Sequence, residues 1–199
     1  MSAPPVAVFY AGANGAGKST MREQQQDTYP GMLHLDPDAI AREIRPQDPR
    51  SVDVLAAKET IRRFRAALVQ CKNFSLETTL SGVTILHRIR GAREAGYWIE
   101  LHYVGLPDPE CNVERVRERA ERGLHSIDPD VVRRRYKDSL ENLPKALPLV
   151  DIAFLYDNWA RPLHPYVVYA GGAFSTLDAP LPKWIQTSMD MDASRSASA

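Results

Sequence analysis

The sequence has no excess of charge of either sign, few cysteines and no long apolar run. Its 199 residues include 25 lysines and arginines and 25 aspartates and glutamates. A protein that binds nucleic acid over a broad surface usually carries a basic excess, so this class is disfavoured. The two cysteines, Cys71 and Cys111, have no metal-type spacing. They fit buried thiols in a reducing compartment.

Segments that would export the chain or place it in a membrane are also missing from the sequence. No apolar run is long enough to cross a bilayer. Residues 1–5 carry no charged side chain, so they lack the pattern of a signal peptide. We therefore expect a cytoplasmic protein. With 44% hydrophobic residues, the length suits an α/β domain with its own core.

The strongest positive signal is the phosphate-binding loop pattern G-x-x-x-x-G-K-[ST], which residues 12–19 match at every fixed position. A strand pattern at 6–10 precedes it and a helix pattern at 21–26 follows, which is the context that this loop requires. The backbone N–H groups of such a loop hold a phosphate chain. Lys18 is expected to reach the β- and γ-phosphates of ATP or GTP, and Ser19 to bind Mg²⁺. The expected nucleotide-binding residues are Gly12, Asn14, Gly15, Ala16, Gly17, Lys18, Ser19 and Thr20.

Strand and helix patterns alternate through the rest of the chain. This alternation predicts the α/β class, with a P-loop NTPase-type, mostly parallel sheet covered by helices on both faces. We expect one kinase domain over residues 1–185, with a small helical lid at about 108–140. Residues 186–199 are rich in Ser, Ala, Asp and Met, and they predict a disordered tail. The expected strands lie at 6–10, 32–35, 73–77, 97–104, 152–156 and 166–169.

Carboxylates follow two of these strands. Asp36 and Asp38 come after 32–35, and Glu77 ends 73–77. Because ligands bind at the carboxyl ends of such strands, these acids are expected beside the phosphate loop. A kinase that acts on an alcohol needs a carboxylate to take the proton of the hydroxyl, and Asp38 is the candidate base. Asp36 is a candidate for Mg²⁺ or substrate binding, or it caps the helix that begins near residue 39.

Glu77 and Thr78 are candidate substrate-binding residues. A buried strand rarely ends in a carboxylate without a partner, so Glu77 is expected to bind substrate or to hold Mg²⁺ through water. The Thr78 hydroxyl either binds substrate or caps the next helix, and the structural role is favoured.

An arginine-rich stretch forms the expected lid. Arg115, Arg119 and Arg122 share one helix face by their spacing, and three arginines follow at 133–135. Lid arginines neutralise the charge that spreads over the γ-phosphate during phosphoryl transfer. The alternative is a solvated helix whose arginines pair with interleaved glutamates. Arg119 and Arg134 are the leading catalytic candidates.

Together these motifs resemble the zeta-toxin family of P-loop kinases, in its short, single-domain branch. The resemblance implies a kinase that uses ATP to phosphorylate the 3′-hydroxyl of UDP-N-acetylglucosamine, and a small helical antitoxin that blocks its nucleotide site. The matching pieces, in the order of the family, are 12–20, 35–41, 77–82, 96–105, 115–127, 134–136, 142–143 and 156–158.

Residue by residue, the resemblance implies Lys18 and Ser19 as phosphate and Mg²⁺ ligands, Asp38 as the base and Glu77 as a substrate-binding residue. Either Arg134 or His125 falls near the second lid arginine of the family, and His125 is a further candidate for substrate binding. The chain departs from the family at Asp36, where Asn is common, and at 123–125, where Gly-Leu-His replaces Gly-Gly-His.

Two other functions fit the same motifs. A kinase for another small alcohol, such as a nucleoside, a sugar or an antibiotic, would have the same fold and loop. A nucleotide-binding switch with little turnover is the third reading. The separate acids at Asp38 and Glu77 argue against a switch, because a switch needs no base that activates an alcohol.

Overall fold

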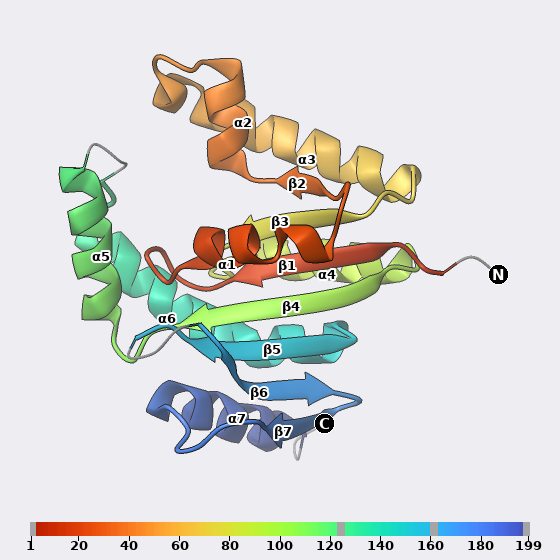
Figure 1. Cartoon of the computed structure of the whole chain (residues 1–199), viewed down its shortest axis with the longest axis vertical. Helices are drawn as coiled ribbons and strands as arrows, with labels where there is room; N and C mark the ends of the chain where they lie inside the picture. The colour runs from red at the N-terminus through yellow and green to blue at the C-terminus, as the bar shows by residue number, and fades with distance from the viewer. Residues whose placement is uncertain (1–2, 123–125, 160–162, 197–199) are drawn as a thin grey trace.

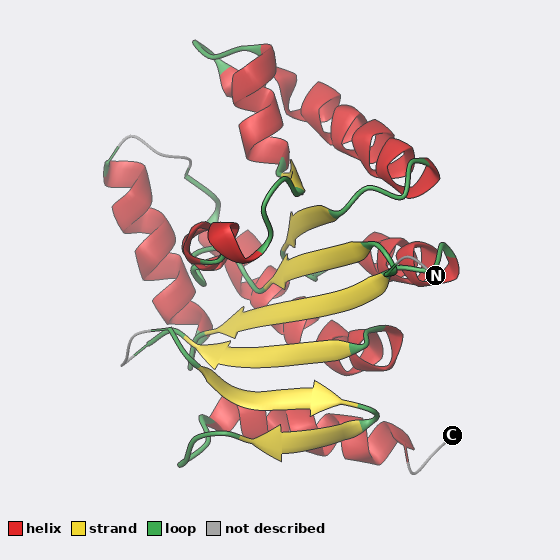
Figure 2. Ribbon diagram, turned by 45° about the vertical axis from the view of Figure 1, so that its right-hand side comes forward, coloured by secondary structure: helices red, strands yellow, loops and turns green. Residues whose placement is uncertain are grey.

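The computed structural model describes residues 3–122, 126–159 and 163–196, and within them the strands form a single sheet (Figure 1). The strand order is β2-β3-β1-β4-β5-β6-β7. The first five strands in this order pair in parallel, while β6 and β7 are antiparallel to their neighbours (Figure 2). The expected mostly parallel sheet is confirmed. The strands are β1 (Val6–Ala11), β2 (Leu33–Leu35), β3 (Phe74–Thr78), β4 (Trp98–Gly105), β5 (Ile152–Asp157), β6 (Pro165–Ala170) and β7 (Ala173–Thr176).

Helices lie on both faces of this sheet. In Figure 1, α1 crosses the near face, α4, α6 and α7 lie behind the sheet, and α2 and α3 lie at its β2 edge. The helix α5 stands at the end of the sheet where the parallel strands finish (Figure 1). The helices are α1 (Lys18–Gln24), α2 (Pro37–Ile44), α3 (Asp53–Val69), α4 (Val83–Glu94), α5 (Pro109–Glu121), α6 (Pro129–Ala146) and α7 (Lys183–Ser196).

The central strand β1 is buried on both faces, which explains its continuous apolar sequence. Phe9 belongs to the larger core, formed with side chains of α3, α4, α6 and α7. Tyr10 points the other way, into a smaller core with Met21 of α1. Because β1 packs on both faces, the position of its carboxyl end in the sheet is fixed, and so is the start of the loop that follows it.

The two helices in the region expected to form the lid, α5 and α6, begin at matching capping sequences. Asp108 accepts a hydrogen bond from the backbone N–H of Glu110 at the start of α5. Asp128 accepts from the N–H groups of Asp130 and Val131 at the start of α6. A proline follows each cap at the first helical position, where its missing N–H costs nothing. Local sequence thus sets where both helices start.

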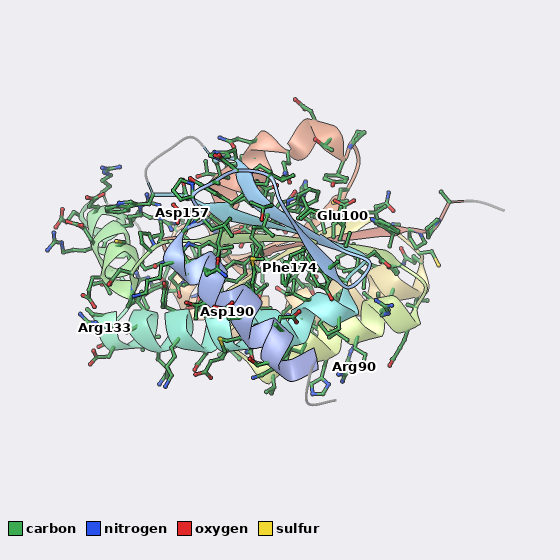
Figure 3. The ribbon with its side chains drawn as sticks, turned by 90° about the horizontal axis from the view of Figure 1, so that it is seen from below. Arg90, Glu100, Arg133, Asp157, Phe174 and Asp190 are labelled. Atoms are coloured by element: carbon green, nitrogen blue, oxygen red, sulfur yellow. The ribbon has the colours of Figure 1, made fainter. Side chains whose placement is uncertain are left out.

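The expectation of a disordered tail from residue 186 is wrong for residues 186–196, which belong to α7. Trp184, Ile185 and Ser188 of this helix are 4%, 0% and 2% exposed. The indole Nε1 of Trp184 donates to Oδ2 of Asp157 at 2.8 Å. Asp157 is the last residue of β5 (Figure 3). The sequence did not indicate this helix, because its composition is mostly polar and only a few of its side chains are buried.

Two further observations concern the cysteines and membranes. Cys71 is exposed and Cys111 is partly exposed, so the expected burial of both thiols is wrong. Within the described parts of the chain, no helix has both the length and the apolar character that crossing a membrane requires.

Candidate active site

The phosphate loop joins the carboxyl end of β1 to the first turn of α1. Gly12, Gly15 and Gly17 have φ values of 135°, 77° and 109°, a region that favours glycine. At Gly12, an added Cβ would lie 2.1 Å from the carbonyl oxygen of Val104 in β4. The glycines are therefore required both by backbone conformation and by the neighbouring strand.

Lys18 lies where the charges of the site converge. Its Nζ donates to the carbonyl oxygen of Ala13 at 3.1 Å. Desolvation by the surrounding protein lowers the pKa of Lys18 to about 8. Carboxylates of Glu77 and Asp38 act in the opposite direction, and the guanidinium groups of Arg119 and Arg135 lower the pKa further. Two acids and two arginines thus lie near enough to act on the same ammonium group.

Glu77 is held from two sides at the end of β3. Ser19 Oγ donates to Glu77 Oε2 at 2.9 Å, and Arg22 Nε donates to Glu77 Oε1 at 2.7 Å. The Glu77 side chain is only 10% exposed. The structure therefore joins Ser19 and Glu77, which the sequence placed at separate strand ends. Arg22 was missed, although its position three residues after Ser19 places both on one face of α1.

Asp36 and Asp38 sit at the start of α2. Oδ1 of Asp36 accepts the backbone N–H of Asp38 at 3.0 Å, so Asp36 caps this helix, one of the roles left open by the sequence. The Asp38 side chain is exposed, and its charge acts on Lys18. Asp38 is thus available to a ligand at the loop, whereas part of Asp36 is already occupied.

The arginine that contacts the phosphate loop from α6 is Arg135. Its Nη1 donates to Oδ1 of Asn14 at 3.0 Å. Arg134 is exposed, because one residue along a helix turns the side chain by about 100°. Asn112 of α5 donates from Nδ2 to the carbonyl oxygen of Asn14 at 2.7 Å, so both lid helices contact this residue.

The other arginines of the lid have different surroundings. Arg119 of α5 lines a cavity above the phosphate loop. Arg133 instead forms ion pairs with Glu110 at 2.6 Å and Asp130 at 2.8 Å, so it follows the alternative of a solvated, glutamate-paired face.

The cavity has a volume of about 390 Å³ and connects the loop with α1, α5 and the segment after β5. Asn158, in that segment, donates from Nδ2 to the carbonyl oxygen of Ala16 at 2.8 Å. The cavity is lined by Gly15, Gly17, Lys18, Ser19, Thr20, Glu23, Arg115, Glu118, Arg119 and Asn158.

Thr78 and His125 are the remaining candidates for substrate binding. Thr78 Oγ1 accepts the backbone N–H of Leu80 at 3.0 Å, so its hydroxyl stabilises the turn after β3. Asn142 Nδ2 donates to the carbonyl oxygen of Leu80 at 2.9 Å and holds the same turn. His125 lies outside the described residues.

The residues around Ser19 have the chemistry that Mg²⁺ prefers. Hydroxyl and carboxylate oxygens of Ser19 and Glu77 are hard donors, and Mg²⁺ usually takes few protein ligands beside phosphates and water. Across residues 3–122, 126–159 and 163–196, no group of three or more His, Cys, Asp or Glu side chains forms a metal site. Ser19 and Glu77 are consistent with a Mg²⁺ site that has few protein ligands and is completed by phosphates and water.

Comparison with known proteins agrees with this arrangement. The model of one protein family, described as Zeta toxin, matches residues 1–158. The chain belongs to the Zeta toxin family. The match covers the phosphate loop, both acids and the lid arginines, and it ends just after β5.

A sequence relative and two solved structures complete the comparison. An uncharacterized protein of Haemophilus influenzae is 41% identical over 130 residues, which are 65% of this chain and 91% of the relative. A structure from the PezAT chromosomal toxin–antitoxin system of Streptococcus pneumoniae is 16% identical, with a TM-score of 0.64 over 96% of this chain and 86% of that one.

The AvrRxo1-ORF1:AvrRxo1-ORF2 complex with sulphate ions is 14% identical, with a TM-score of 0.69 over 96% of this chain and 64% of that one. The same complex with ATP gives a TM-score of 0.56. At these identities, the likeness to solved structures shows a shared fold.

Proposed function

We propose that this member of the Zeta toxin family is a kinase that transfers the γ-phosphate of ATP to a hydroxyl of a sugar nucleotide, UDP-N-acetylglucosamine. The observation that most supports a kinase is the arrangement around Lys18. The charges of two carboxylates, Glu77 and Asp38, and of two arginines, Arg119 and Arg135, act on this lysine of the phosphate-binding loop. Arg119 also lines the cavity at the loop. A binding module that only holds a nucleotide has no use for a separate acid that is open to an acceptor.

In the proposed reaction, the hydroxyl oxygen of the acceptor forms a bond to the γ-phosphorus of ATP. Asp38 accepts the proton that this hydroxyl loses. The bond between the γ-phosphorus and the bridging oxygen breaks, and ADP leaves. Lys18 holds the phosphate chain, while Arg119 and Arg135 neutralise the charge on the transferred group. Arg135 takes the role that the sequence alone assigned to Arg134, because it contacts the phosphate loop through Asn14.

Ser19 and Glu77 are the residues that would hold Mg²⁺, directly or through water. Bound there, the ion would offset negative charge on the β- and γ-phosphates. Asp36 would contribute only its second carboxylate oxygen, which lies 4.0 Å from Arg42 Nη2, because the first oxygen caps α2. Arg22 holds the Glu77 carboxylate in the orientation in which it accepts from Ser19.

Glu77 is also the proposed contact for the acceptor. A carboxylate has about four lone-pair positions, so it can accept a hydroxyl of the sugar in addition to Ser19 and Arg22. Membership of the Zeta toxin family favours UDP-N-acetylglucosamine as this acceptor. Because the similar PezAT proteins form a toxin–antitoxin system, we also propose a small helical antitoxin that covers the nucleotide site.

The test is to incubate the protein with Mg²⁺, ATP and UDP-N-acetylglucosamine and to search by mass spectrometry for the sugar nucleotide with one added phosphate. Asp38→Asn should reduce its formation by about 10²-fold, the usual scale for loss of a general base, and should leave ATP binding intact. Asp27→Asn, at another exposed aspartate, is the matched control and should leave the rate unchanged.

Three outcomes separate the alternatives. Formation of the product in the wild type and its loss in Asp38→Asn support the full proposal. ATP consumption with a different alcohol, but not with this sugar nucleotide, would retain the kinase and reject the acceptor. Full activity in Asp38→Asn would place the base elsewhere.

A further inference from the structure

A second cavity lies between α3 and α4, and its volume is about 240 Å³. Among the described residues, it shares no lining side chain with the cavity at the phosphate loop. In Figure 1, α3 lies at the β2 edge and α4 lies behind the sheet, whereas α1 crosses the near face. The second cavity is thus separate from the candidate active site. It is lined by Ile61, Phe64, Arg65, Thr84, His87 and Arg88.

The positive charge in this cavity has no acidic counterpart. Arg65, His87 and Arg88 line it, together with no carboxylate. Within the part of the chain that the structure describes, neither of these arginines forms an ion pair. One turn earlier on α3, Arg62 is paired with Glu59 at 2.7 Å. Arg88 is half-buried, and this burial lowers its pKa. Cations held without a partner beside apolar surface favour a negatively charged ligand.

The floor of the cavity is apolar and closely packed. Phe64 is 7% exposed, and its ring meets that of Phe74 edge to face, with ring centres 5.4 Å apart. Ile61 lies beside Phe64 in the lining. Sites for small-molecule ligands usually have volumes of about 300–1,000 Å³. The smaller volume here suits one apolar side chain of another protein better than a whole cofactor.

Exposed valines extend the apolar surface along α3. Val54, Ile61, Arg65 and Val69 recur at helical spacing, which places them on one face of this helix. Val54 and Val69 are 72% and 85% exposed. A helical segment from the first of these residues to the last is about 22 Å long. A partner helix of about 15 residues matches this length.

A glycine inside α4 also points to a partner on this surface. Gly91 follows Arg88 by three residues and therefore lies on the same side of the helix. An added Cβ on Gly91 would meet nothing within 4 Å among the described residues, so no contact in the chain requires a glycine there. Glycine destabilises the interior of a helix relative to alanine. Close approach of another backbone is a reason to have no side chain at this position.

We propose that the groove between α3 and α4 binds an acidic, amphipathic helix of a partner protein. One apolar side chain of that helix fills the cavity over Ile61 and Phe64, and flanking carboxylates pair with Arg65 and Arg88. Docking in this groove leaves the nucleotide cavity open. This distinguishes the partner from an antitoxin that covers the nucleotide site.

Fluorescence anisotropy with three labelled helical peptides of about 15 residues tests the groove. The first peptide has leucines at helical spacing among glutamates, the second has lysines in place of the glutamates, and the third has serines in place of the leucines. We expect saturable, micromolar binding of the first peptide alone, and this binding should weaken as the salt concentration rises. No saturation by the first peptide up to about 1 mM, or equal binding of another peptide, would overturn the proposal.

Variants of the groove provide the second readout. Arg65→Glu and Arg88→Glu should each weaken the first peptide by about 10-fold or more. Arg90→Glu is the matched control, because this exposed arginine is turned by about 200° from Arg88 around the same helix. Gly91→Gln should block the groove without lowering the midpoint of thermal unfolding, since glutamine is the better helix former. Unchanged affinity in Arg65→Glu and Gly91→Gln, or an equal loss in Arg90→Glu, would contradict a specific groove.

Other occupants of the groove would give different results. Co-sedimentation with phosphatidylglycerol vesicles, without binding of the first peptide, would assign the groove to a membrane surface. A dimer in light scattering that Arg65→Glu abolishes would assign it to a second copy of the chain. Either result overturns the proposed partner helix. Phosphoryl transfer should be unchanged in Arg65→Glu and Gly91→Gln, so the failure of the kinase and the failure of the groove can be told apart.

Discussion

The phosphate loop and the helical lid face the same cavity, but they are held in place by different means. The loop is fixed by its backbone, since β4 leaves no room for a side chain at Gly12. The helices α5 and α6 contact the loop through individual side chains, in the hydrogen bonds of Asn112 and Arg135 to Asn14. Backbone constraints leave a glycine pattern in the sequence, whereas side-chain attachments leave none.

This difference has an energetic side. Loss of one side-chain hydrogen bond between these helices and the loop costs on the order of 1 kcal/mol. A change in the loop backbone affects every phosphate contact at once. We therefore expect larger effects from substitutions in the loop than from those in the lid.

Lys18→Ala should have the largest effect. Removal of the ammonium group takes away the positive charge that meets the phosphates, and we expect kcat/KM to fall by about 10³-fold or more. ADP release in the presence of acceptor measures the loss, with the exposed Lys58→Ala as control. Normal turnover by Lys18→Ala would show that phosphates bind elsewhere.

Arg135→Ala should have an intermediate effect and should discriminate between the two lid arginines. We expect a fall in kcat of roughly 10²-fold, because one charged contact to the transferred group is lost. Arg134→Ala is the matched control, since its side chain is exposed one position earlier on α6. If Arg134→Ala lowered kcat and Arg135→Ala did not, Arg134 would be the acting arginine, as the sequence predicted. That result would also mean that α6 rotates when ligand binds.

The pH dependence of nucleotide affinity should show the smallest effect of the three. Lys18 has a pKa lowered to about 8 in the free protein, and bound phosphates raise the pKa of a nearby ammonium group. Binding then requires proton uptake above this pH. Affinity for ADP should be constant below about pH 8 and fall by up to about tenfold per unit above it.

Calorimetry in two buffers of different ionisation enthalpy measures that proton uptake. Lys18→Arg keeps its charge throughout, so any binding that it retains should lack the step at pH 8. A wild-type affinity that stays flat to about pH 9.5 would contradict the lowered pKa.

Most of the sheet could be predicted from sequence, and the reasons are local. The run at β1 is apolar because both of its faces are buried, and the aspartates at α5 and α6 mark helix starts. The hairpin partner β7 and the helix α7 were missed. Most residues of β7 are exposed, and α7 is anchored by few buried side chains, so neither carries a strong pattern.

Part of the candidate site could also be predicted from the sequence. The sequence predicted that loop and strand-end residues lie close together, because parallel strands finish at one edge, and Glu77 does reach Ser19 there. The proposal of Arg135 in place of Arg134 could not be made from sequence, since the rotation of α6 is set by its packing. Arg22 and Asn112 were also missed, because their partners lie 55 and 98 residues away in the chain.

The hydrogen bond between Trp184 and Asp157 joins the last helix to the edge of the sheet that carries the loop. Gly105 is shaped for the same contact, since an added Cβ there would lie 2.4 Å from the Trp184 ring. A ligand that steadies residues 157–159 therefore also steadies α7, beyond the region that defines the family. We therefore expect the local unfolding free energy of this helix to rise when a ligand occupies the site.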